Sequence, residues 1–95
     1  MANLRNLKKE IDYTLEEFVF DCDMAMYCQP SKADEIFALM EQSVSLRNSL
    51  FERVNSPAEP RNRSLVKKHY SAIRNSIDVS FGELFDKLSS LVNVG

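Results

Sequence analysis

The side chains that could do chemistry in this chain are two cysteines, one histidine and a short run of carboxylates. Cys22 and Cys28 lie six residues apart. On a helix this spacing means about 9 Å of rise and about 240° of rotation, so the two thiols cannot form a disulfide with each other. It also differs from the C-x-x-C spacing of metal sites. We therefore expect two reduced thiols and no cofactor.

Glu17 and Asp21 lie four residues apart on one helix face, with Asp23 close by. Paired carboxylates can perform acid–base chemistry or hold a metal ion, but metal sites in bundles add Glu-x-x-His motifs, and none occurs here. The residues after His69 lack the lysine and glycine that usually follow the reactive histidine of phosphotransfer domains. We therefore predict no metal site and no catalytic residue, and interpret these groups as a solvated acidic face and a surface histidine.

The elements that position these groups follow from apolar residues that recur at steps of three and four, the spacing of one helix face. The longest such run extends over 63–94, and similar runs predict helices over 3–28 and 32–54. Ser31 is expected to cap the second helix and Asn62 the third. The predicted apolar face of the second helix comprises Ile36, Phe37, Leu39, Met40, Val44, Leu46, Leu50, Phe51 and Val54.

Short connections between consecutive helices predict an all-α fold, an up-down-up antiparallel three-helix bundle with a long C-terminal helix, in one domain over 1–95. Ser80-Phe81-Gly82-Glu83 has the form of a capping box, so residues 80–93 could instead form a fourth helix. The apolar spacing keeps its phase through Gly82. We therefore favour one helix, straight or kinked at this glycine.

Arg47 lies in the middle of the predicted apolar face of the second helix. An arginine in such a position is normally paired or extends its head group to water. Asp12 is at a similar height on the first helix. We predict a structural ion pair between these two residues in preference to a ligand contact.

The bulk properties exclude several classes of protein. The net charge of −2 provides no general attraction to nucleic acid or to an acidic membrane. No apolar run approaches the roughly 20 residues of a membrane span, and no apolar core of a signal peptide follows Met1. We therefore expect a cytoplasmic protein with no membrane partner.

A second apolar row lies on the first helix, nearly opposite its predicted core face, when residues are placed at 100° intervals. Aromatic residues and methionine are enriched at protein interfaces, although loop ends and side-chain stems could also cover such a row. The end of the third helix is expected to extend past the second helix. Its apolar residues would then be exposed to solvent unless the first helix or a second copy of the chain covers them. A symmetric homodimer would bury both features. The predicted interface comprises Tyr13, Phe20, Met24, Tyr27, Leu88, Leu91 and Val92.

Charge separates along the predicted bundle. Ten of the twelve basic residues fall at the end that holds the start of the chain and the Pro57–Pro60 loop, and most acidic residues fall at the other end. A basic end that includes a helix N-terminus could bind phosphate or a nucleic-acid backbone. The cations concerned are Arg61, Arg63, Lys67 and Lys68. We favour a solvated surface, because no nucleic-acid motif accompanies them.

The leading hypothesis is therefore a small non-enzymatic helical bundle of unknown process that acts by protein–protein interaction, most simply as a homodimer. The alternative, from a different class, is an anion- or nucleic-acid-binding accessory protein that uses the basic end.

Overall fold

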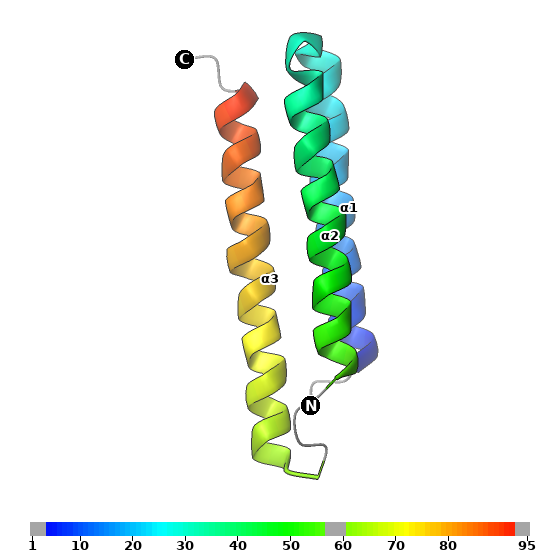
Figure 1. The fold of residues 1–95 in the computed structure, drawn as a ribbon, viewed down its shortest axis with the longest axis vertical. Coiled ribbons are helices and arrows are strands. Elements are labelled where there is room, and N and C mark those ends of the chain that lie inside the picture. The colour runs from blue at the N-terminus through cyan, green and yellow to red at the C-terminus, as the bar shows by residue number, and fades with distance from the viewer. Residues whose placement is uncertain (1–3, 57–60, 93–95) are drawn as a thin grey trace.

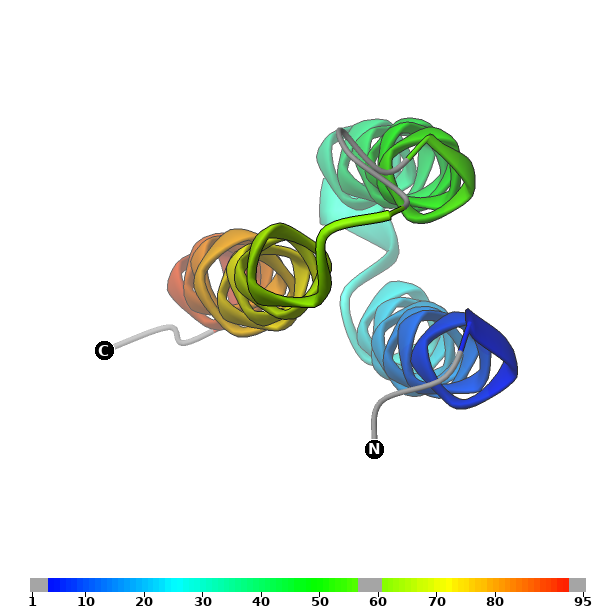
Figure 2. The ribbon, with the colours of Figure 1, turned by 90° about the horizontal axis from the view of Figure 1, so that it is seen from below.

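Three helices account for nearly all of the computed structural model, which describes residues 4–56 and 61–92. They are α1 (Leu4–Cys28), α2 (Ala33–Asn55) and α3 (Arg63–Val92), with a short 3₁₀ turn, η1 (Pro30–Lys32), between the first two (Figure 1). The molecule measures 51 × 20 × 18 Å. Seen along its length, the helices occupy the corners of a triangle (Figure 2). The predicted up-down-up three-helix bundle is confirmed.

The helix ends agree with the sequence at one position and differ at another. The Asn62 side chain caps α3, because its Oδ1 accepts the amide N–H of Leu65 at 3.2 Å, as expected. The predicted Ser31 cap of α2 is wrong. Pro30 opens η1, where the Lys32 amide donates to the Gln29 carbonyl at 3.0 Å, so α2 begins only at Ala33. Ser31 therefore lies inside the turn, and no side chain caps α2.

One continuous helix passes through Gly82, so the alternative of a fourth helix over residues 80–93 is wrong for the described part of that segment. Ile77, Phe81 and Leu84 are buried on the same side of α3. These three side chains all reach the core only if the helix continues through Gly82 without a break. Their burial therefore favours one helix over the new helix start that the capping-box pattern suggests. The predicted Pro57–Pro60 loop and the predicted end of the third helix at Val94 lie outside the described residues.

The core is apolar along the whole bundle. Its buried side chains are Leu7, Ile11, Phe18, Cys22, Ala25, Ile36, Leu39, Leu50, Val54, Ile73, Ile77, Phe81, Leu84 and Leu88. Phe37 and Val44, placed on the core face of α2 by the sequence, are 54% and 46% exposed. They lie seven residues apart, on a flank about 90° from the α2 core centre, and a bundle of three helices provides no neighbour there.

The expected ion pair is present. Arg47 Nε lies 3.2 Å from Asp12 Oδ1, between the middle of α2 and α1. The guanidinium carbon of Arg47 also lies 3.8 Å from the centroid of the Phe51 ring. The side chain is therefore held by a carboxylate and an aromatic face while it remains one-third exposed, which agrees with a structural role at the α1–α2 seam.

Candidate protein-binding surface

The apolar row on α1 is exposed along its whole length. Tyr13, Phe20, Met24 and Tyr27 are 67%, 63%, 50% and 85% exposed, respectively. These four residues are called the α1 row below. The opposite face of α1 is buried against α2 and α3, so the row points away from both neighbours. Four large apolar side chains on one outward face are unusual for a surface that meets only water.

The end of α3 behaves differently from the α1 row. Leu88 is only 5% exposed, and Leu91 and Val92 are half-buried against the core. The Gln29 side chain, just after α1, donates a hydrogen bond from Nε2 to the Val92 carbonyl at 2.8 Å. At this end α3 stops short of the start of α2, and it extends past α2 only at its own beginning (Figure 1), so the predicted extension of the third helix past the second is wrong. Leu88 is therefore buried within the bundle without a second copy of the chain.

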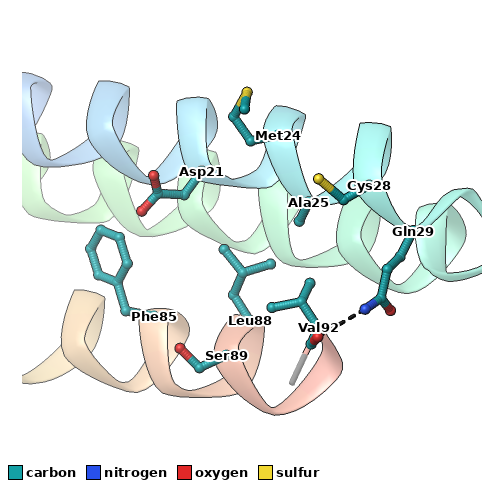
Figure 3. A pocket seen from close by; sticks show the side chains of 9 residues that line it. All are labelled: Asp21, Met24, Ala25, Cys28, Gln29, Phe85, Leu88, Ser89 and Val92. Carbon is teal, nitrogen blue, oxygen red and sulfur yellow. Dashed lines mark hydrogen bonds between the residues drawn. The ribbon is translucent and has the colours of Figure 1, made fainter. Parts of the chain in front are cut away.

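A groove of about 340 Å³ lies between the last turns of α1 and α3 (Figure 3). Phe85 and Leu88 point from α3 toward α1 in this view, and the hydrogen bond from Gln29 closes one end. Met24 belongs to both the groove and the α1 row, so the two form one continuous surface. The lining residues are Asp21, Met24, Ala25, Cys28, Gln29, Phe85, Leu88, Ser89 and Val92.

The surface around the row and the groove is acidic. Residues 10–31 contain six carboxylates and neither lysine nor arginine. Two of the six are paired at the basic end of the bundle, Glu10 with Arg74 at 3.6 Å and Asp12 with Arg47 at 3.2 Å. The other four are exposed and form no ion pair within the described residues: Glu16, Glu17, Asp21 and Asp23. Their charge is therefore available to a binding partner.

The two cysteines differ in environment. Cys22 is fully buried, and this burial, with smaller contributions from Asp23 and Asp21, raises the pKa of its thiol from 9.0 to about 11. Cys28 is exposed at the edge of the groove. Both thiols are free, as the sequence analysis expected. A buried thiol with a raised pKa is a poor nucleophile, so Cys22 acts as a core residue.

His69 links two helices. Its Nε2 lies 2.6 Å from the carbonyl oxygen of Arg53 in the last turn of α2. A carbonyl only accepts hydrogen bonds, so Nε2 carries the proton and donates. The Arg53 guanidinium in turn donates to the Ser76 hydroxyl at 2.8 Å. These bonds join the end of α2 to α3, so His69 helps to hold the two helices together.

The four predicted anion-binding cations are exposed at the start of α3 but do not converge. Arg61, Arg63, Lys67 and Lys68 form no ion pair or hydrogen bond within the described residues. On α3, Arg63 and Lys67 share a face, whereas Lys68 is rotated by about 100°. The Asn62 side chain also takes one amide of the first turn, that of Leu65. The helix N-terminus therefore has fewer free donors for an anion.

Among residues 4–56 and 61–92, no three potential metal-binding side chains come together, and no helix is both long and apolar enough to cross a membrane. Comparison with protein-family models, with curated protein sequences and with solved structures gives no match for this chain.

Proposed function

We propose that this protein is a non-enzymatic helical module that binds another protein chain through the α1 row. The observation that carries the proposal is the exposure of four large apolar side chains on the one face of α1 that no helix covers. Aromatic side chains and methionine supply much of the binding energy at protein interfaces. The potentially reactive groups are also dispersed, since His69 joins α3 to the end of α2 while Cys28 lies at the opposite end of the bundle.

A second copy of the chain is the simplest occupant of the row. Antiparallel pairing of two α1 helices about Phe20 would set Tyr13 of one copy opposite Tyr27 of the other. The same pairing would set Glu17 opposite Asp23, with no cation between them. A homodimer of this kind should therefore become tighter as salt increases, because salt screens the repulsion. Light scattering after size exclusion at low and at physiological salt measures this directly.

Removing the aromatic groups of the row should abolish the contact while the fold is retained. The test variant is Phe20→Ser with Tyr27→Ser, and the matched control is Phe37→Ser with Val79→Ser, whose side chains are equally apolar and about half exposed on other helices. All four positions are exposed, so both variants should unfold within about 1 kcal/mol of the wild type.

In cells that express the protein, cross-linking followed by mass spectrometry should detect the same neighbours for the wild type and the control. The row variant should lose them. Equal neighbours for all three proteins, with equal molar masses in solution, would contradict a binding role of the row.

Binding of an anion or nucleic acid at the basic end is the second candidate. It is supported by four exposed cations that have no partner among the described residues, but these do not share a face. We therefore expect a labelled DNA duplex to bind with a dissociation constant no lower than about 10⁻⁶ M at physiological salt, the tight limit of non-specific contact. Fluorescence anisotropy measures this. Tighter binding that is lost in Arg63→Gln with Lys67→Gln would favour the second candidate.

A further inference from the structure

The groove between α1 and α3 has the shape of a helix-binding site. On α1 its lining falls at Asp21, Met24, Ala25 and Cys28, and on α3 at Phe85, Leu88, Ser89 and Val92. Both sets follow the positions i, i+3, i+4 and i+7. Four residues in this pattern form the hole into which one side chain of a neighbouring helix inserts in knobs-into-holes packing. Two such holes lie side by side, one on each wall of the groove (Figure 3).

Small residues at the centre of the groove favour the close approach of a helix. Ala25 on α1 and Ser89 on α3 occupy the i+4 position of the two holes. Gly82, seven residues before Ser89, continues the same face of α3, and a Cβ placed on it would meet no atom within 4 Å. Large side chains that are only partly buried then provide the apolar contact, namely Met24, Phe85 and Val92.

Charge determines which helix fits. Asp21 lines the groove, and Glu17 lies one turn earlier on the same face of α1. Asp78 lies seven residues before Phe85 and thus on the groove side of α3. All three are exposed, and none forms an ion pair within the described residues. Among the described residues on this face of α3, the first cation toward the start of the helix is Arg74, about 16 Å from Phe85, and it is paired with Glu10.

We infer that the groove binds an amphipathic helix of a partner protein, with apolar residues at three- and four-residue steps and lysine or arginine on both flanks, as a fourth helix of the bundle. The inference rests on the proposed protein-binding function and specifies the partner. A second copy of the chain fits less well, because α1, the most apolar outward helix, is itself flanked by carboxylates. A cationic helix would place opposite charges along both rims.

The test uses a synthetic helical peptide of about four turns, with leucine on one face and lysine on the flanks, and a twin in which glutamate replaces every lysine. Fluorescence anisotropy with the full-length protein should show at least about tenfold tighter binding of the lysine peptide at low salt. Added salt should reduce this difference, because the rim charges are exposed.

Two neighbouring serines provide matched variants. Ser89→Phe fills the groove, whereas Ser90→Phe adds the same ring to an exposed position outside the groove lining. The first should weaken binding of the lysine peptide by about tenfold or more, and the second should leave it unchanged. Asp21→Asn should weaken it by a smaller factor, about two- to fivefold, as expected for one exposed charge.

The outcomes separate this inference from the proposed function. Equal affinity for both peptides, no binding of either, or equal binding by the two phenylalanine variants would overturn the cationic-helix assignment. Phe20 and Tyr27 do not line the groove, so the serine variants of the row test the proposed function independently. Loss of cellular neighbours in the row variant, combined with normal peptide binding by Ser89→Phe, would leave the row as the binding surface and exclude the groove.

Discussion

Replacing Phe18 by alanine is expected to lower the free energy of unfolding by about 3–5 kcal/mol, a large fraction of the stability of a domain of this size. The Phe18 side chain is fully buried. Its ring meets that of Phe85 edge to face, with the centroids 5.1 Å apart and the planes at 87°. The substitution removes this aromatic pair and leaves a cavity at the point where α1 contacts α3. Urea unfolding followed by far-ultraviolet circular dichroism measures the change.

Phe20 provides the control for this prediction, because it has the same side chain two residues further along the same helix. It is 63% exposed, so Phe20→Ala should change the free energy of unfolding by no more than about 0.5 kcal/mol. The two variants should also differ in function, since only Phe20 belongs to the α1 row. Similar losses of stability in both variants would mean that Phe20 is covered in the folded protein, and the proposed interface would fail with it.

The two phenylalanines also illustrate how far the sequence predicts the fold. Periodicity alone separates Phe18 from Phe20, because helical spacing places residues two apart on different faces. The same reasoning correctly predicted the three helices, the exposed position of the α1 row and the Arg47–Asp12 pair. Each of these depends on helix phase or on the height of a residue along an antiparallel pair, and both can be read directly from residue numbers.

Other features depend on how the helices are rotated about their axes, which spacing does not determine. Phe37 and Val44 have the right phase for the flank of a core, but only a fourth helix would cover that flank. The sequence placed Leu88 beyond the reach of α2, yet α3 ends short of the start of α2 (Figure 1) and Leu88 is buried. The groove forms only where the lining residues of α1, at positions i, i+3, i+4 and i+7, lie opposite those of α3 at the same height along the bundle. The small residues Ala25 and Ser89 were its only signal in the sequence, and neither is unusual by itself.

Solvent exposure explains why the proposed site lies where it does. Three helices enclose one apolar seam and leave the outer face of every helix in water. On α3 that face is mostly polar or charged, whereas on α1 it carries three aromatic side chains and a methionine. The groove continues this surface toward α3 through Met24, which contributes to both. One contiguous apolar area with acidic edges is thus formed from two helices, and a partner helix could contact all of it at once.

Cys22 makes the stability of the bundle dependent on alkaline pH. Burial raises the pKa of its thiol from 9.0 to about 11, so the unfolded chain ionises at a lower pH than the folded protein. Below about pH 9 both states keep the thiol proton, and burial of the neutral group has its full stabilising effect. As pH rises from 9 to 11, the unfolded state loses the proton before the folded state does, and about 2 kcal/mol of stability is lost.

Cys22→Ala isolates this effect, because alanine does not titrate. The variant should be less stable than the wild type at neutral pH, since it leaves a small cavity. This difference should shrink between pH 9 and 11 by about 2 kcal/mol, as urea unfolding at each pH measures. Cys28→Ala is the matched control, because it removes an exposed thiol and leaves no cavity in the core. A parallel decline of the wild type and Cys22→Ala would show that other groups cause the alkaline loss, and that water reaches Cys22 in the folded bundle.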